Sequence, residues 1–151
     1  MLRPVSRTFH GRDVFAPAAA HLALGVEPAE LGPPLDPAGL VRLVVPEPEV
    51  RPAALRATIL YVDRFGNMQL NLTREHAVAA GIAPGMRVEL QLPLDRYAAS
   101  VTATFGEAQP GDLLLYEDSY GHLAIAVTGG DAAGVVQAKP GDEVRIAVVP
   151  E

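Results

Sequence analysis

The sequence contains no cysteine. Disulfides, thiolate metal sites and cysteine nucleophiles are therefore excluded, and the composition fits a reducing compartment. No apolar run approaches the roughly 20 residues that a membrane-spanning helix needs. The first residues also lack the apolar core of a secretory signal peptide. We therefore expect a cytoplasmic protein without a membrane partner.

Basic and aromatic residues are scarce. Only 12 Lys and Arg residues stand against 18 Asp and Glu residues, which gives a formal net charge of −6, and aromatic residues make up 5% of the chain. Nucleic-acid-binding proteins usually carry a basic face, and those that bind single strands need aromatic stacking platforms. The composition therefore argues against a nucleic-acid partner. With 49% hydrophobic residues, the 151-residue chain can bury a core, as one domain or as one domain plus a remnant of another.

The sequence also lacks the paired spacing of metal-binding histidines and a nucleophilic serine motif. The four histidines show no paired spacing of metal ligands, so we expect no metal site: they are His10, His21, His76 and His122. No G-x-S-x-G motif is present, so a serine hydrolase of that type has no support. We also expect no cofactor.

The pattern of the chain changes near residue 50. In the first part, Asp13 can cap a helix, Pro17 suits its first turn and Gly25 suits its end. The stretch from Pro28 to Pro52 holds seven prolines, which predict an extended connection. We therefore separate residues 1–50, a helix and a proline-rich linker, from residues 51–151.

Residues 51–151 are predicted to be mainly β. Three Pro-Gly pairs suit type II turns, and each precedes a strand-like run: Pro84-Gly85, Pro110-Gly111 and Pro140-Gly141. Residues 87–92 and 143–148 alternate apolar and polar side chains, as strands with one buried face do. Two short helices are expected, one capped by Thr73 and stopped by Gly81, the other capped by Asp131. About seven strands at this spacing indicate a small antiparallel barrel or sandwich.

Three segments carry side chains suited to chemistry. The first places His10, Gly11, Arg12 and Asp13 just before a helix, although an isolated histidine is more often structural or solvated than catalytic. Taken alone, this segment indicates little.

The other two segments are predicted hairpins. In the turn of residues 63–67, Asp63 can hold an ammonium group and Asn67 can use both amide functions on a ligand, but turn formation alone explains both residues. The third segment combines a turn containing Ser119 with Gly129-Gly130, whose backbone N–H groups can serve an anion or a purine edge. This glycine pair matches neither a P-loop nor G-x-G-x-x-G.

Taken in order, the three segments resemble one family. The matching runs are TFHGRDVFAPAAAHLALG, YVDRFGNMQLNL and LYEDSYGHLAIAVTGGDAA, followed by PGDEV. They are similar to the S-adenosylmethionine (SAM) hydroxide adenosyltransferases, relatives of the SAM-dependent fluorinase and chlorinase. The resemblance covers about the C-terminal half of such an enzyme. It implies that residues 1–50 include the tail of an α/β domain and that residues 51–151 form a β-barrel domain.

The resemblance implies a reaction in which water attacks the ribose C5′ of SAM and gives adenosine and methionine. His10 matches the family's histidine near the water, whose aspartate and arginine partners belong to a part of the enzyme that this sequence lacks. The family's site lies between subunits of a trimer, so the resemblance implies a homotrimer in which this chain supplies half a site. We therefore expect the chain alone to be inactive.

The substrate-binding residues carry over position by position. Asp63 and Asn67 match residues at the amino-acid end of the substrate, and Ser119 matches a serine that contacts its carboxylate. Phe105 aligns with an aromatic residue beside the adenine, and Gly129 with a backbone contact to the adenine edge. We expect Asp63, Asn67 and Ser119 to converge on one surface. We expect the carboxylate of Asp118 to face solvent.

Three positions depart from the family's pattern. Tyr120 and Val127 stand where the fluorinase has arginines, which favours the hydrolase over the halogenase. Thr128 stands where many relatives have asparagine. Two alternatives stay open: a SAM-dependent halogenase, and a non-catalytic SAM-binding, adenosine-binding or oligomerisation module.

Overall fold

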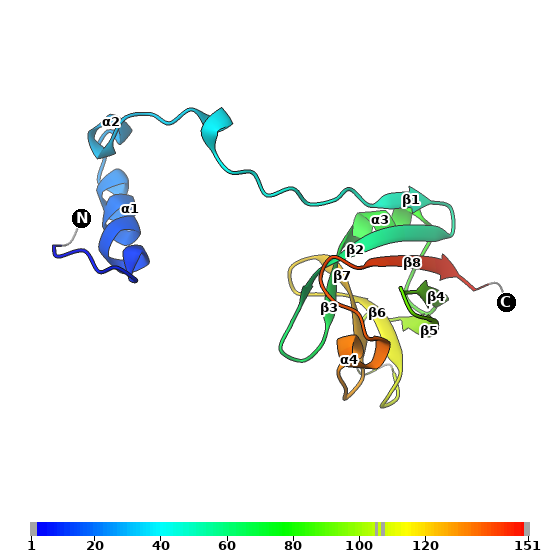
Figure 1. Ribbon diagram of the computed structural model, residues 1–151. Helices are drawn as coiled ribbons and strands as arrows, with labels where there is room; N and C mark the ends of the chain where they lie inside the picture. The colour runs from blue at the N-terminus through cyan, green and yellow to red at the C-terminus, as the bar shows by residue number, and fades with distance from the viewer. Residues whose placement is uncertain (1–2, 105, 107, 150–151) are drawn as a thin grey trace. The chain divides into compact units, whose positions relative to one another are not determined.

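The computed structural model describes residues 3–104, 106 and 108–149. Its contacts divide the chain into two compact units, residues 1–43 and 44–151, and each unit is described by itself. Figure 1 shows the helices of the first unit and the strands of the second. Among the described residues, no helix is both long and apolar enough to cross a membrane.

The first unit is helical, but its helix begins earlier than predicted. A π-helical turn, η1 (Gly11–Phe15), continues into α1 (Ala16–Ala23). The predicted N-cap at Asp13 is therefore wrong, because this carboxylate lies inside the helix and is held by Ser6 and Arg12 instead. Gly25 ends the helix as predicted, with φ of +87°. Two short elements follow: α2 (Pro28–Leu31) and a 3₁₀ turn, η2 (Pro37–Gly39).

The second unit holds the strands and two short helices. The strands are β1 (Glu49–Arg51), β2 (Ala54–Val62), β3 (Met68–Thr73), β4 (Arg87–Gln91), β5 (Arg96–Val101), β6 (Leu113–Glu117), β7 (His122–Val127) and β8 (Glu143–Val148). The helices are α3 (Arg74–Ala79) and α4 (Ala132–Val136). Gly81 ends α3, and Asp131 caps α4 by accepting from Gly134 N at 2.8 Å, so both predicted short helices are confirmed.

Seven strands of the described chain close into a barrel. Their order is β2-β3-β7-β6-β5-β4-β8, and β8 pairs again with β2 to close the ring. β1 pairs only with the first residues of β2. The predicted β-barrel is confirmed, with one difference: β5 and β6 run parallel. Parallel neighbours need a longer crossover connection, whereas antiparallel neighbours need only a hairpin.

The Pro-Gly turns form as the sequence predicts. In each turn the glycine has φ of +92°: Gly85, Gly111 and Gly141. A backbone hydrogen bond closes each turn across four residues, with N···O distances of 3.1–3.2 Å. Only glycine adopts such a φ without strain, so these residues set the direction in which β4, β6 and β8 begin.

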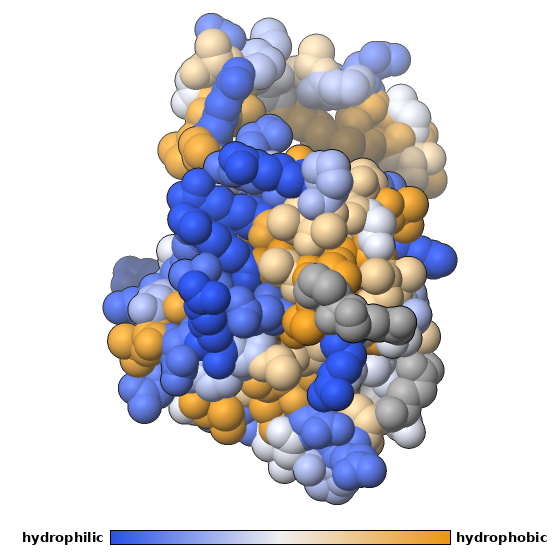
Figure 2. Space-filling view, turned by 90° about the vertical axis from the view of Figure 1, so that its right-hand side faces the viewer, coloured by the Kyte–Doolittle hydropathy of each residue, from blue (hydrophilic) through white to orange (hydrophobic). Residues whose placement is uncertain are grey.

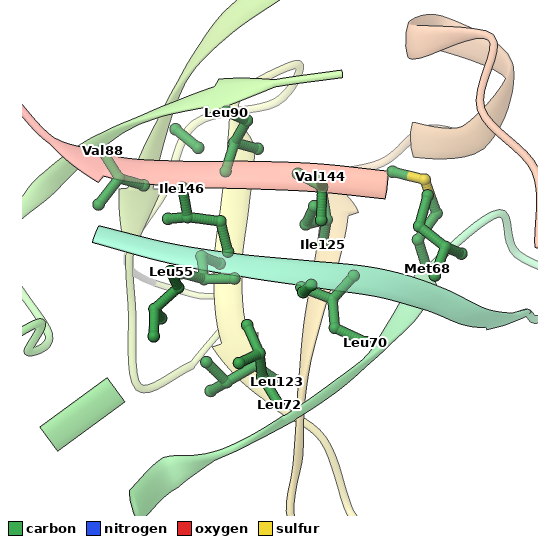
Figure 3. Packing of buried hydrophobic residues seen from close by; sticks show 14 of the residues in the cluster. Leu55, Met68, Leu70, Leu72, Val88, Leu90, Leu123, Ile125, Val144 and Ile146 are labelled. Carbon is green, nitrogen blue, oxygen red and sulfur yellow. The ribbon is translucent and has the colours of Figure 1, made fainter. Parts of the chain in front are cut away.

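The core lies inside the barrel. Figure 3 shows side chains from β2, β3, β4, β7 and β8 pointing toward one another between the strands. Val88 and Leu90 of β4 are fully buried, whereas Glu89 between them is half-buried and the flanking Arg87 and Gln91 are exposed, as the alternation predicts. Each buried side chain of this size contributes about 1.5–3 kcal/mol to folding.

Ion pairs cover the outward face of the barrel. Arg56 of β2 contacts Glu49 of β1 at 2.9 Å and Glu143 of β8 at 2.5 Å. Figure 2 shows one face of the molecule, on which hydrophilic residues form a band beside a mainly apolar area. Because the paired side chains are more than 40% exposed, we attribute little stability to them.

Candidate functional site

The turn between β2 and β3 is organised by Asp63. Its Oδ1 accepts hydrogen bonds from the backbone N–H groups of Phe65 at 2.8 Å and Asn67 at 2.9 Å. Its Oδ2 accepts from Asn67 Nδ2 at 2.9 Å. The chain closes the turn by two backbone bonds, and Gly66 has φ of +85°. Asp63 is therefore a fixed carboxylate that also positions the Asn67 side chain.

The turn between β6 and β7 repeats this geometry around Asp118. Its Oδ1 accepts from the backbone N–H groups of Tyr120 at 2.8 Å and His122 at 3.0 Å. Gly121 has φ of +79°, close to its counterpart in the first turn. The expectation that the Asp118 carboxylate faces solvent is therefore wrong, because both of its oxygens hold protein donors. Ser119 follows this anchored residue.

The second turn is linked to β3, the strand that follows the first turn. Gln69 Nε2 donates to Asp118 Oδ2 at 2.6 Å, so β3 holds the second turn from the side of the first. Between the turns lies a cleft of about 490 Å³. It is lined by Tyr61, Asp63, Asn67, Gln69, Ala103, Thr104, Tyr116, Glu117, Asp118, Ser119, Tyr120 and Ala124.

The cleft brings together three of the predicted ligand residues. Asp63, Asn67 and Ser119 all line it, although 56 positions separate the first from the last. The expected convergence of the two turns is thus confirmed as geometry, while the contacts of these residues with a substrate stay a prediction.

A second hollow of about 510 Å³ lies on the other side of the first turn. Gly129 lines this hollow with Phe65 and Val127, and Asn67 lines both the hollow and the cleft. Asn67 therefore stands between the predicted amino-acid end and the predicted adenine end. Phe105, the remaining predicted substrate residue, lies outside the described residues.

Gly66 is packed against the start of α4. A Cβ at this position would lie 2.0 Å from Asp131 Oδ1 and 2.8 Å from Asp131 Cα. The backbone joins the same elements, because Ala133 N donates to Gly66 O at 3.0 Å. The glycine thus lets the first turn approach α4 closely, which places the turn between the cleft and the second hollow.

The cleft is electrostatically negative. Burial raises the pKa of Asp63, but hydrogen bonds from Asn67, Phe65 and Gly66 outweigh burial and hold this pKa below its ordinary value. The pKa of Asp118 is likewise lowered: burial opposes ionisation, but the bond from Gln69 and the backbone donors outweigh it.

The negative charges of the cleft also affect the pKa of the Tyr116 phenol. Burial, followed by the charges of Asp118 and Asp63, raises its pKa. The residues described include no group of three or more His, Asp or Glu side chains that could hold a metal ion.

His10 belongs to the first unit, where its side chain is exposed at the start of η1. The neighbouring Asp13 is buried within this unit and accepts from Arg12 Nη2 at 2.9 Å and Ser6 N at 2.9 Å. The bond from Arg12 and the backbone bond from Ser6 lower the pKa of Asp13 to about 2. Arg12 and Asp13 therefore hold the segment that presents His10.

Sequence reasoning missed the residues that support the site. Gln69, Tyr61 and Tyr116 line the cleft, but the strand pattern explains them equally well in the sequence. One signal was available for the second turn, because D-R-F-G-N at 63–67 and D-S-Y-G-H at 118–122 share an aspartate, an aromatic residue and a glycine at the same spacing.

The small closed barrel belongs to a known class of domain. The family model for the SAM hydroxide adenosyltransferase C-terminal domain matches residues 57–145, and that for the N-terminal domain matches residues 1–32. The chain belongs to the SAM hydroxide adenosyltransferase family.

Curated relatives agree with this assignment. The chain is 46% identical over 144 residues to an (R)-S-adenosyl-L-methionine hydrolase of Salinispora tropica, covering 94% of this chain and 51% of that protein. A protein of the same name from Thermus thermophilus is 39% identical over 143 residues, covering 95% and 50%. A fluorinase of an Actinoplanes species is 34% identical over 145 residues, covering 92% and 48%. The chain thus spans about half the length of the curated relatives it matches.

Solved structures show the same fold. A conserved protein from Thermotoga maritima superposes with a TM-score of 0.80 at 34% identity, covering 97% of this chain and 55% of that one. A conserved protein from Thermus thermophilus superposes with a TM-score of 0.62 at 36% identity, covering 91% and 52%.

Proposed function

We propose that this chain is the substrate-binding half of an enzyme that hydrolyses SAM to adenosine and methionine. The observation that carries the proposal is the convergence of Asp63, Asn67 and Ser119 on one cleft. A zwitterionic amino acid needs an anion for its ammonium group and neutral donors for its carboxylate, and two turns at one end of a barrel can offer both.

Each binding residue has a role in this proposal. The Asp63 carboxylate holds the ammonium group of the substrate, and the Ser119 hydroxyl donates to its carboxylate. Asn67 lies between the cleft and the second hollow, where it can contact the middle of an extended ligand. The Gly129 backbone meets the adenine edge, with Phe105 as the aromatic residue beside the base.

The chemistry proposed is a displacement at the ribose C5′. An oxygen–carbon bond forms, the carbon–sulfur bond breaks, and sulfur takes the bonding electron pair, so the sulfonium becomes the neutral thioether of methionine. Water is a poor nucleophile and must lose a proton, so a group that orients it or accepts its proton accelerates the step. We assign this role to His10, acting with residues from outside this chain. The proposed reaction uses SAM as substrate and needs no cofactor.

The proposed assembly is a homotrimer. In it the cleft of one subunit would meet the N-terminal domain of a neighbour, which would complete the site around the ribose and the water.

A chimera tests the proposal. The N-terminal half of the Salinispora tropica relative would be fused to this chain in register, and chromatography would follow SAM. The chimera should release adenosine and methionine in equal amounts, whereas the 151-residue chain alone should release neither. A His10→Ala chimera should keep its oligomeric state and lose activity.

Two outcomes would favour the alternatives. Release of a 5′-halogenated nucleoside in the presence of chloride or fluoride would favour a halogenase. A folded, SAM-binding chimera that releases no product would favour a non-catalytic binding module. Tyr120 and Val127, which replace the arginines of the fluorinase, support the hydrolase.

A further inference from the structure

The charged residues in the described lining of the cleft are of one sign. Asp63, Glu117 and Asp118 line it, and its described lining includes no Lys, Arg or His. Asp63 and Asp118 are each held by three hydrogen-bond donors from the protein. Both carboxylates therefore remain charged at neutral pH, and their positions are fixed before a ligand arrives.

Two arginines beside the cleft lining have partners of their own. Arg74 Nη1 lies 4.0 Å from Glu117 Oε2, and the Arg74 side chain is 73% exposed. Arg64 lies over the ring of Phe65, with its Cζ 4.6 Å from the ring centroid. Such an exposed ion pair neutralises little of the charge that a ligand meets.

Aromatic rings add to the attraction for a cation. Tyr61, Tyr116 and Tyr120 all line the cleft. Tyr61 is 57% exposed and Tyr120 is 83% exposed, so their ring faces are available to a ligand. The face of an aromatic ring attracts a cation, whether sulfonium or ammonium.

The carboxylate of SAM meets the opposite situation. The donor proposed for it is the Ser119 hydroxyl, which is neutral, and three carboxylates line the same cleft. A like-charge pair within one cleft is repulsive even in water, and three such pairs together can change affinity by about tenfold. The repulsion weakens when salt screens it.

We propose that this cleft selects adenosyl sulfonium compounds by their positive charge, and that it binds the form whose aminopropyl chain lacks the carboxylate at least as tightly as SAM itself. This inference rests on the proposed function. It names the substrate class more closely: an adenosyl sulfonium with a terminal amine, for which the carboxylate adds no affinity.

Calorimetric titration of the 151-residue chain with SAM and with decarboxylated SAM tests the inference at low and at high salt. We expect decarboxylated SAM to bind up to about tenfold more tightly at low salt, with the ratio falling toward one at high salt. A Tyr120→Arg variant, which adds a cation at an exposed position of the cleft, should reverse the preference. Leu94→Arg is the matched control, because Leu94 is 68% exposed and does not line the cleft; it should leave the preference unchanged.

The outcomes separate the two proposals. Tighter binding of SAM than of decarboxylated SAM at low salt, or a preference that does not change with salt, would overturn the charge selection and leave the proposed function standing. Binding of neither compound would overturn the proposed role of this chain as the substrate-binding half. A reversal by Leu94→Arg as large as that by Tyr120→Arg would show that net charge, and not the cleft, sets the preference.

Discussion

Gln69 donates to Asp118 across 2.6 Å, and this bond joins β3, which follows the first turn, to the second turn of the cleft. Gln69→Leu should leave Asp118 Oδ2 without that donor and should lower the free energy of unfolding by about 1 kcal/mol. It should also weaken SAM binding, because the Ser119 turn loses its link to β3. Gln91→Leu, at an exposed position of β4, is the control. Equal urea midpoints for the two variants would contradict this role.

Asp63 should contribute more to ligand binding than an equivalent turn aspartate elsewhere. Asp63→Asn keeps the shape of the side chain but removes the charge that holds the ammonium group. SAM binding should weaken by about 1.5–3 kcal/mol, the range for a hydrogen bond to a charged group. Asp142→Asn is the control, because Asp142 also accepts a backbone hydrogen bond in its turn, at 3.0 Å, but does not line the cleft. Calorimetry showing equal affinities for both variants would remove Asp63 from the site.

Gly66 and Gly81 both have a positive φ, but their surroundings differ. Their φ values are +85° and +74°, but only Gly66 would place a Cβ against Asp131. Gly81→Ala should show the penalty of the left-handed backbone alone, about 1–2 kcal/mol. Gly66→Ala should be less stable by about a further 1–3 kcal/mol, because the added methyl group must displace α4. Urea unfolding of both variants measures the difference, and equal losses would contradict the close packing.

The anchoring carboxylates predict a loss of stability in acid. The pKa values of Asp63 and Asp118 lie below the ordinary 3.8 in the folded protein. Their contribution is therefore complete above about pH 4, and it is lost as the pH falls through the folded pKa values. Asp63→Asn should lose less stability than the unchanged protein between pH 4 and pH 2.5. If the free energy of unfolding fell equally with decreasing pH in the two proteins, Asp63 would not be preferentially ionised in the folded state.

Local patterns were sufficient to predict much of the fold. The Pro-Gly turns, the alternation around Val88 and Leu90 and the ends of α3 are decided by residues close in sequence, so the sequence predicts them. The parallel pairing of β5 with β6 was not predictable, because no local pattern in either strand sets the direction of its neighbour. The start of the first helix was mispredicted, because Asp13 is bound by Arg12 and Ser6 and does not cap the helix.

The candidate site was predicted in its ligand residues but not in its support. Asp63, Asn67 and Ser119 came from a resemblance, and chemistry suggested that they meet. The Gln69–Asp118 bond and the contact between Gly66 and Asp131 join residues 49 and 65 positions apart. Such pairs are set by strand register and packing, which no local motif reveals.

Amide chemical-shift mapping of the ¹⁵N-labelled 151-residue chain, titrated with SAM, tests the central claim most directly. If the two turns form one ligand site, amide signals of residues 63–67 and 118–122 should shift together and follow one binding curve. Signals of the β4–β5 turn around Leu94, remote from the cleft lining, should not move. Shifts confined to one turn, different curves for the two turns, or no shift in either would contradict the account.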